Sequence, residues 1–357
     1  MKCERNVRQA EPTPSVTGPK QAAPYPRRMH TILVPTDIAD RLREPLAAFP
    51  DLEVIAAPEG EGEVLSPEQM EAIDAAFFNT ASGPLASRRV LGAARRAKNL
   101  KWLHMGHSGA DDPIFQELMD RGVAVTNSAG VAAEPIAQTA MAGLLAVTRG
   151  IPGWIEAKRR HSWEQSPREL PPEEQPPVLS EQTMVILGLG AIGGYVARYA
   201  RAFGIHVIGV RRTPASAEDG VDEWVSPDRL TEVLPRANFL VSTIPLTADT
   251  RGMLDAAALD LLPAGAVFVN VSRGEVVDQG ALIERLAFGR IAGAYLDVTD
   301  PEPLPEDSAL WDLPNVIVSP HDSARSAGTR ALTEAIFLEE LGRWLRGEES
   351  PRLVRDR

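Results

Sequence analysis

Residues Met184-Val-Ile-Leu-Gly-Leu-Gly-Ala-Ile-Gly193 are the segment of this chain that says most about its fold. It begins with apolar residues typical of a buried strand and continues with glycines at positions 188, 190 and 193. Apolar residues at 192, 196, 200 and 203 recur with the period of a helix, and residues 206–210 form a second strand-like run. Strand, glycine turn, helix and strand within about 30 residues make a unit that binds dinucleotides.

Each glycine has a physical reason in such a unit. Gly188 permits the tight turn, Gly190 lets a pyrophosphate approach the helix N-terminus, and Gly193 lets helix and strand pack closely. We therefore expect cofactor contacts at Gly188, Gly190, Ala191, Ile192 and Gly193. Another nucleotide-like ligand, or a purely structural turn, is the alternative interpretation of this motif.

The end of the second strand predicts which dinucleotide binds. NAD-binding versions of the unit carry an acidic residue about 20 residues beyond the glycines, where it binds the ribose hydroxyls. This chain has Arg211-Arg212-Thr213 at that place. Because a guanidinium pairs with the 2′-phosphate of NADP, we expect NADP to contact Arg211, Arg212 and Thr213, with NAD as a possible second cofactor. The alternative is a solvated pair of loop arginines.

Short strand-like runs alternate with helical stretches on both sides of this unit. They fall at residues 31–34, 53–56, 76–78, 102–105, 123–126, 184–187, 206–210, 239–244, 267–271, 291–298 and 316–318. Such alternation predicts parallel sheets covered by helices. The expected fold class is α/β, with two doubly wound parallel-sheet domains of Rossmann or flavodoxin type and a cleft between them. A long helix at about 135–148 lies between the two series.

The chain of 357 residues is long enough for two domains of roughly 100–200 residues each. Residues 1–28 hold five prolines and lack the apolar core of a secretory signal, so we expect a disordered tail. Residues 166–177 also hold five prolines and predict a linker or arm. No apolar run reaches the roughly 18 residues of a membrane-spanning helix.

Charge and cysteine content exclude several classes of protein. The formal net charge of −12 gives a negative global field, which repels nucleic acid. Cys3 is the one cysteine, so an intramolecular disulfide and a cysteine-based zinc site are excluded. A reducing, cytoplasmic location fits best. We expect no nucleic-acid partner, no membrane partner and no metal.

Three polar residues follow strands of the second series, at the edge where doubly wound sheets bind ligands. Arg273 comes after the run 267–271, Glu302 after 291–298, and His321 after 316–318. Each residue alone has a plainer interpretation, as a surface ion pair, a loop charge or a satisfied histidine. Together, at the ends of three successive strands, they predict an acid–base set beside a nicotinamide pocket.

Three segments around these residues resemble a known family. They are Asn270-Val-Ser-Arg-Gly-Glu-Val-Val-Asp278, Asp297-Val-Thr-Asp-Pro-Glu-Pro303 and Ser319-Pro-His-Asp-Ser323. In this order after the glycine motif, they are similar to the signature segments of the D-isomer-specific 2-hydroxyacid dehydrogenases. Further matches lie at 100–102, 109–111, 126–130, 245–247 and 310–315, and the resemblance covers about residues 30–348.

The resemblance implies a role for each residue. Arg273 binds the substrate carboxylate and polarises the keto oxygen, His321 is the general acid and base, and Glu302 pairs with His321 and raises its pKa. Further cofactor contacts are implied at Pro245, Thr250, Val271, Ser272 and Asp297, the last near the nicotinamide carboxamide. Substrate contacts are expected at Thr80, Ala81, Ser108 and Gly109, together with Arg273.

The reaction implied is the reduction of a 2-oxo acid to a D-2-hydroxy acid by NADPH, as in glyoxylate and hydroxypyruvate reductases. The substrate domain comprises residues 29–127 and 324–350, the dinucleotide domain residues 128–323, and a homodimer joins through the latter. Glyoxylate, hydroxypyruvate, pyruvate and phenylpyruvate-like acids all stay open as substrates. One alternative is a dinucleotide-sensing binding protein or corepressor on the same fold. Another is a phosphoglycerate dehydrogenase-like enzyme.

Three residues depart from the family pattern. Gln138 stands where many members have Glu, Glu340 stands where Asn is usual, and His107 lies near the substrate loop where small residues are common. We expect Gln138 and Glu340 to affect packing only. His107 either contacts the substrate or lies one layer behind it or exposed to solvent, and we favour the last two positions.

Overall fold

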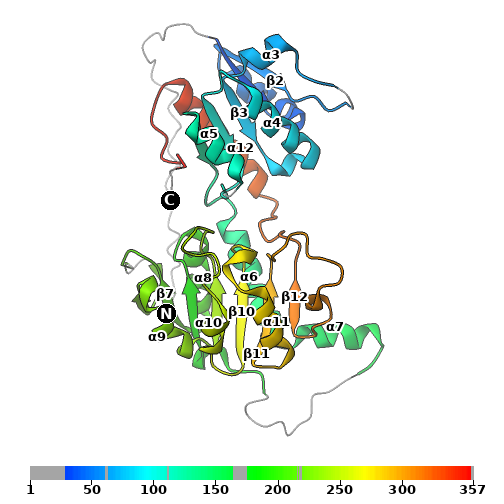
Figure 1. Cartoon of the computed structure of the whole chain (residues 1–357), viewed down its shortest axis with the longest axis vertical. Helices are drawn as coiled ribbons and strands as arrows, with labels where there is room; N and C mark the ends of the chain where they lie inside the picture. The colour runs from blue at the N-terminus through cyan, green and yellow to red at the C-terminus, as the bar shows by residue number, and fades with distance from the viewer. Residues whose placement is uncertain are drawn as a thin grey trace, which may run out of the picture.

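The computed structural model describes residues 29–60, 63–110, 112–163, 175–214, 216 and 219–354. Figure 1 shows two lobes, each built on one sheet with helices packed against it. The predicted tail, residues 1–28, lies outside the described residues, as does most of the proline-rich segment 166–177. No helix in the described ranges is long and apolar enough to cross a membrane.

The first lobe holds a parallel sheet with the strand order β2-β1-β3-β4-β5. This order is that of flavodoxin-like doubly wound sheets. Apolar side chains bury both faces of the sheet, in one cluster that includes Val90 and another that includes Phe337. The strands are β1 (His30–Val34), β2 (Leu52–Ala56), β3 (Ala75–Phe78), β4 (Trp102–Met105) and β5 (Ala124–Asn127).

The second lobe holds a parallel sheet with the strand order β12-β11-β10-β9-β6-β7-β8. The order reverses at β6, which pairs with both β7 and β9, and this reversal is the switch point at which Rossmann sheets bind dinucleotides. The strands are β6 (Thr183–Leu187), β7 (His206–Val210), β8 (Glu223–Val225), β9 (Phe239–Ser242), β10 (Ala266–Asn270), β11 (Ile291–Leu296) and β12 (Val316–Val318).

The predicted fold class is confirmed, and the expected strands are present with ends shifted by at most two residues. One further strand, β8, was not predicted from the sequence. It consists of Glu223, Trp224 and Val225 and has no apolar run. Pairing with the buried strand β7 holds it in place, and a contact of this kind is invisible to local patterning.

Helices connect the strands and cover the sheets. They are α1 (Thr36–Arg41), α2 (Arg43–Ala47), α3 (Pro67–Ala72), α4 (Pro84–Arg96), α5 (Pro113–Asp120), α6 (Ala133–Thr148), α7 (Ile151–Arg159), α8 (Ala191–Ala202), α9 (Leu230–Val233), α10 (Ala256–Asp260), α11 (Gln279–Ala287) and α12 (Thr329–Leu345). Helix α6 packs on the second sheet beside α8 through small residues such as Ala137 and Ala140, which explains its low polarity.

The chain returns to the first lobe through α12 after completing the second. The Phe337 ring of α12 stacks on Phe77 of β3 with centroids 4.1 Å apart, and Leu341 joins the same buried cluster. Beyond the helix, the amide of Val354 donates to the carbonyl of Val125 in β5. The first lobe is therefore assembled from both ends of the described chain (Figure 1).

Candidate active site

Glu302 and His321 form a hydrogen-bonded pair beyond the carboxyl ends of two neighbouring strands. Glu302 follows β11, and His321 follows β12, which pairs with β11 in parallel. The imidazole Nδ1 of His321 lies 2.9 Å from Oε2 of Glu302. The backbone of His321 has a φ of 54°, in the left-handed region that residues with side chains rarely adopt. Contacts around its loop must hold this conformation, because it is energetically costly.

The pair shifts the pKa of both groups. The hydrogen bond and charge of Glu302 raise the pKa of His321 above its usual value, against the opposing effects of burial and of the Arg273 charge. Burial by itself raises the pKa of Glu302, but the hydrogen bond and charge of His321 outweigh it and hold that pKa below its usual value. The geometry therefore favours an imidazolium paired with a carboxylate near neutral pH.

Arg273 lies three residues beyond the end of β10, the strand that pairs with β11 on the side opposite β12. The Asn270 side-chain amide donates to the carbonyl of Arg273 at 2.9 Å, and the Arg273 guanidinium donates to the carbonyl of Ser272 at 2.7 Å. The guanidinium charge acts on both Glu302 and His321. The structure thus brings the three predicted catalytic residues into one electrostatic group.

Asp297 is buried immediately after the end of β11. Its carboxylate accepts hydrogen bonds from the Ser319 hydroxyl at 2.6 Å and from the amides of Asp322 and Ser323 at 3.0 and 3.1 Å. The Ser323 hydroxyl donates to its other oxygen. A carboxylate has about four lone-pair sites, so these four donor groups use most of its capacity. These contacts let Asp297 hold the His321 loop.

The glycine motif has the form that a bound pyrophosphate requires. Gly188 has a φ of 92°, and a β-carbon at position 193 would lie 2.0 Å from the Gly188 carbonyl oxygen. Both positions therefore need glycine. At Gly190, the residue that precedes α8, a β-carbon would meet no atom within 4 Å, which leaves open space over the helix N-terminus. The backbone here fits a dinucleotide.

Arg211 is bound within its own loop, which the sequence did not suggest. Its guanidinium lies 3.0 Å from Asp219 Oδ1 and donates to the carbonyls of Thr213 and Pro214 at 2.7 and 2.6 Å. The Arg212 and Thr213 side chains are exposed beside it. Arg211, at the position where NAD-binding units carry an acidic residue, thus orders its loop, and the Asp219 carboxylate partly neutralises its charge.

The other predicted cofactor residues lie beyond the ends of β9 and β10. The Thr250 hydroxyl donates to the carbonyl of Pro245 at 2.7 Å and so closes the turn after β9. Val271 and Ser272 are buried at the end of β10, and the Ser272 hydroxyl lies 2.8 Å from that of Ser242. These contacts fix the loop backbones next to the switch point.

The predicted substrate residues lie beyond the ends of two strands in the first lobe. Thr80 and Ala81 follow β3, and the Asn79 side chain accepts a hydrogen bond from the amide of Ala81 at 3.1 Å. Ser108 and Gly109 follow β4, and the Asn127 side chain donates to the carbonyl of Ser108 at 3.2 Å. Asn79 and Asn127 hold these loops. The role of Asn127 was not predicted from the sequence. The only signal there was that residues 126–130 match the family.

The residues that depart from the family pattern contact the protein itself. The His107 ring packs edge-on against Phe78, with centroids 5.4 Å apart. The Gln138 side chain reaches the Tyr199 hydroxyl at 3.5 Å, between α6 and α8. Glu340 is buried in α12 and accepts a hydrogen bond from Ser350, which ties the end of the described chain to the helix.

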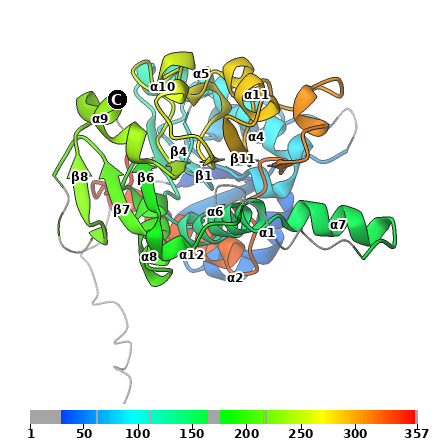
Figure 2. The same ribbon diagram turned by 90° about the horizontal axis from the view of Figure 1, so that it is seen from below.

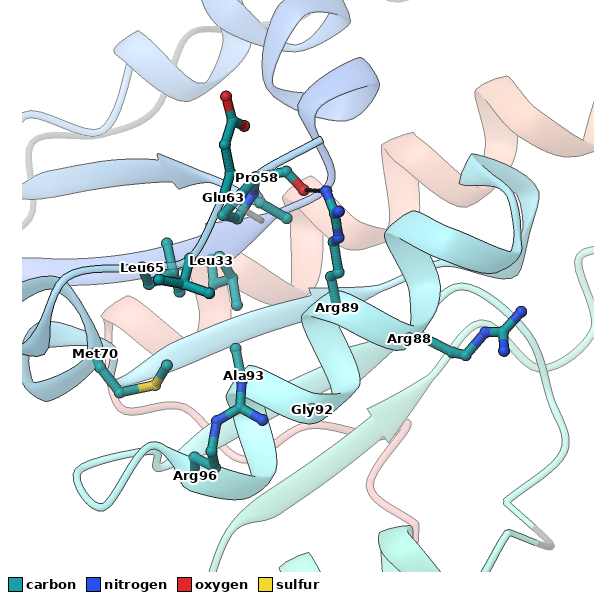
Figure 3. A pocket seen from close by; sticks show the side chains of 12 residues that line it. Leu33, Pro58, Glu63, Leu65, Met70, Arg88, Arg89, Gly92, Ala93 and Arg96 are labelled. Carbon is teal, nitrogen blue, oxygen red and sulfur yellow. Dashed lines mark hydrogen bonds between the residues drawn. The ribbon is translucent and has the colours of Figure 1, made fainter. Parts of the chain in front are cut away.

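A cavity of about 540 Å³ lies beside α4 in the first lobe (Figure 3), and none of the predicted site residues lines it. Leu33, Met70 and Ala93 give it an apolar lining. The Arg89 guanidinium at its rim donates to the carbonyls of Pro58 and Gly60, so this cation is used to hold the loop after β2. The described residues contain no cluster of acidic, histidine or cysteine side chains placed to hold a metal ion.

Comparisons with known proteins agree with this geometry. Residues 141–323 match the family described as D-isomer specific 2-hydroxyacid dehydrogenase, NAD binding domain. The chain is 36% identical over 251 residues to the glyoxylate reductase of Korarchaeum cryptofilum (strain OPF8), covering 69% of this chain and 73% of that protein. It is 33% identical over 268 residues to the glyoxylate reductase/hydroxypyruvate reductase of Homo sapiens, covering 74% and 79%.

A solved structure shows the same likeness over nearly the whole chain. It is a D-isomer specific 2-hydroxyacid dehydrogenase from Xanthobacter autotrophicus Py2 in complex with NADPH and MES, with 32% identity and a TM-score of 0.71 over 92% of this chain and 98% of that one. The two sheets, the glycine turn and these relatives define an oxidoreductase that uses a nicotinamide dinucleotide. The chain belongs to the D-isomer specific 2-hydroxyacid dehydrogenase family.

Proposed function

We propose that this protein reduces a small 2-oxo acid to the D-2-hydroxy acid with NADPH. The observation that carries the proposal is the hydrogen bond between His321 and Glu302, 2.9 Å long, within reach of the Arg273 charge. A 2-oxo acid needs a cation for its carboxylate and a proton donor at its keto oxygen. These residues supply both.

In the proposed reaction, Arg273 binds the substrate carboxylate and stabilises the negative charge that develops on the keto oxygen. The nicotinamide, when bound, supplies the hydride for the keto carbon. The His321 imidazolium donates a proton to the oxygen, and Glu302 keeps that imidazole protonated before the reaction. In the direction of oxidation, the neutral imidazole accepts the proton instead.

The first lobe completes the site in this proposal. Thr80, Ala81, Ser108 and Gly109 present backbone groups beyond β3 and β4, where small anions bind in doubly wound folds. Closure of the two lobes brings these loops to the substrate held by Arg273 and excludes water from it. Asn79 and Asn127, which hold the loops, have positioning roles.

The preference for NADPH rests on the pair Arg211 and Arg212. Because Arg211 is already bound to Asp219 and to loop carbonyls, Arg212 is the better candidate for the 2′-phosphate, with Arg211 shaping the loop beneath it. Thr213 presents a hydroxyl at the same turn. The relative from Xanthobacter autotrophicus was solved with NADPH, which supports the proposal.

A homodimer is part of the proposal. Helix α7 projects from the second lobe (Figure 2), and its Trp154 and Ile155 side chains are 60% and 50% exposed. Large apolar side chains exposed together favour a protein interface. Light scattering of the parent should give the mass of two chains, and Trp154→Glu with Ile155→Glu should give one. Phe288→Glu, which changes an exposed aromatic at the end of α11, is the control and should stay dimeric.

A substrate panel tests the activity directly. NADPH and NADH oxidation should be followed at 340 nm with glyoxylate, hydroxypyruvate, pyruvate and phenylpyruvate. We expect turnover with at least one acid and greater kcat/KM with NADPH. Binding of NADPH without oxidation by any acid would instead favour the sensing or corepressor alternative.

A further inference from the structure

A buried tyrosine, Tyr295, contacts the loop that contains Ser319 and His321. Tyr295 lies in β11 with 3% of its surface exposed, and its hydroxyl is 2.7 Å from the Ser319 hydroxyl. The ring packs against Gly143 of α6, where a β-carbon would lie 2.2 Å from the ring carbon Cγ. The absence of a side chain at 143 therefore gives the ring its place. Neither Tyr295 nor Ser319 is itself assigned to substrate or cofactor, although Ser319 donates to Asp297, for which the family resemblance implies a cofactor contact.

Tyr295, Ser319 and Asp297 form a chain of hydrogen bonds, and the number of hydroxyl protons fixes the direction of each bond. Asp297 accepts from the Ser319 hydroxyl at 2.6 Å, and a serine has one hydroxyl proton to give. The Tyr295 hydroxyl must therefore donate to Ser319. Burial raises the pKa of Tyr295 to about 12, so the phenol keeps the proton that this arrangement needs. The chain runs from Tyr295 through Ser319 to Asp297.

Asp297 connects this chain of hydrogen bonds to the backbone of the loop that contains His321. The His321 amide donates to the Asp297 carbonyl at 2.8 Å, and the Asp297 carboxylate accepts from the amides of Asp322 and Ser323 on the other side of the histidine. The loop is thus fixed on both sides of a residue whose φ is 54°. Networks of this kind couple their members more strongly than isolated hydrogen bonds do.

We propose that Tyr295 and Ser319 are positioning residues that, through Asp297, hold His321 against Glu302 in the orientation needed for proton donation. This inference rests on the proposed function for its kinetic consequence, but the hydrogen-bond chain exists without substrate. It assigns a catalytic consequence to a tyrosine that otherwise resembles ordinary core packing. The charged groups that act on the imidazole are Glu302, Arg273 and Asp297. Changing Tyr295 or Ser319 removes none of these charges, and Ser319→Ala takes one hydrogen bond from the Asp297 carboxylate.

The test is a double-mutant cycle with Tyr295→Phe, Ser319→Ala and the double variant. Tyr295→Phe removes one hydroxyl and leaves the ring on Gly143. We expect kcat to fall roughly fivefold, the effect of losing one hydrogen bond, with little change in the Kd for NADPH. Because Tyr295 acts through Ser319, the tyrosine change should have little further effect once Ser319 is alanine. Tyr199→Phe, which removes an exposed hydroxyl bonded to Glu134, is the matched control.

A second readout requires neither substrate nor cofactor. The pKa of His321 can be measured by NMR titration of its imidazole, identified by the signal that disappears in His321→Gln. A looser contact with Glu302 should lower that pKa in Tyr295→Phe and Ser319→Ala, and leave it unchanged in Tyr199→Phe.

The possible outcomes separate this inference from the proposed function. An active parent with equal kcat and an equal His321 titration in Tyr295→Phe overturns the inference. Effects of Tyr295→Phe and Ser319→Ala that simply add also overturn it, because the tyrosine then acts by packing alone. A parent that reduces no oxo acid contradicts the proposed function, while the titration still decides whether the chain holds His321.

Discussion

The imidazole of His321 and the carboxylate of Glu302 lie 2.9 Å apart, although they belong to separate loops at the ends of β12 and β11. The parallel pairing of these strands aligns Leu296 with Val318, so both loops leave the sheet at the same edge. The side chains are partly exposed, at 47% and 39%. They are therefore open to a substrate, and their pairing sets the charge of the histidine.

Replacing Glu302 with glutamine should lower the pH at which reduction falls off. Glu302 raises the pKa of His321, and reduction needs the imidazolium, so activity is lost as pH rises through that pKa. Without the carboxylate the loss should begin at lower pH. The measurement is kcat/KM for the oxo acid from pH 5.5 to 9.5. Glu306→Gln, an exposed change in the same loop, should keep the parent profile; a parent-like profile for Glu302→Gln would exclude the assignment.

The arginine pair should separate the two cofactors. Arg212→Ser should lower kcat/KM with NADPH by about tenfold or more and leave NADH largely unaffected, because one charge-assisted phosphate contact is lost. Arg211→Ser should weaken both cofactors, since it releases the loop that Asp219 and Thr213 hold. Steady-state kinetics with both cofactors would show this. A parent equally efficient with NADH argues against a 2′-phosphate site.

Two adjacent glycines offer a matched test of the dinucleotide turn. In Gly193→Ala the new β-carbon meets the Gly188 carbonyl oxygen at 2.0 Å, so we expect a loss of about 3 kcal/mol or more in unfolding free energy and much weaker NADPH binding. In Gly194→Ala the β-carbon meets nothing within 4 Å, and stability should rise by up to about 1 kcal/mol. Urea unfolding and fluorescence titration measure both quantities. Similar behaviour of the two variants would rule out the close packing seen here.

His104 should make the protein sensitive to acid. It is fully buried between the Thr126 and Ser128 hydroxyls, and burial lowers its pKa from the usual 6.5 to about 3. Because the unfolded chain takes up this proton near pH 6.5 and the folded chain does not, the stability contribution is complete above pH 6.5 and is lost as pH falls toward 3. The cost at pH 5 is about 2 kcal/mol.

The control for this effect is His104→Gln, which keeps hydrogen-bonding groups but does not titrate. Urea unfolding of both proteins at pH 7.5 and pH 5 isolates the histidine from other ionisable groups. The parent should lose more stability than the variant on acidification. Equal losses would mean that His104 is protonated in the folded state or shares its site with water.

Local sequence patterns predicted most of the architecture because the strands are apolar and the glycine turn is rigidly constrained. The positions of Arg273, Glu302 and His321 at one edge of the sheet could be predicted, since each follows a strand of one parallel sheet. The contacts that depend on register or on side-chain reach could not. One example is the ion pair between the Asp219 carboxylate and Arg211. Another is the hydrogen bond from Tyr295 to Ser319, which depends on the strand register that pairs Tyr295 with Ile317, two residues before Ser319.

The proposed reaction predicts both the rate and the chirality of product formation with NADPH and the best oxo acid of the panel. The parent should form the D-2-hydroxy acid, identified by chiral chromatography. His321→Asn should form it 10²- to 10⁴-fold more slowly, roughly the effect of losing a proton donor, with the Kd for NADPH nearly unchanged. An L-product would contradict the proposed D-specific reduction, and a His321→Asn enzyme that reduces the oxo acid at close to the parent rate would contradict the role of His321 as proton donor.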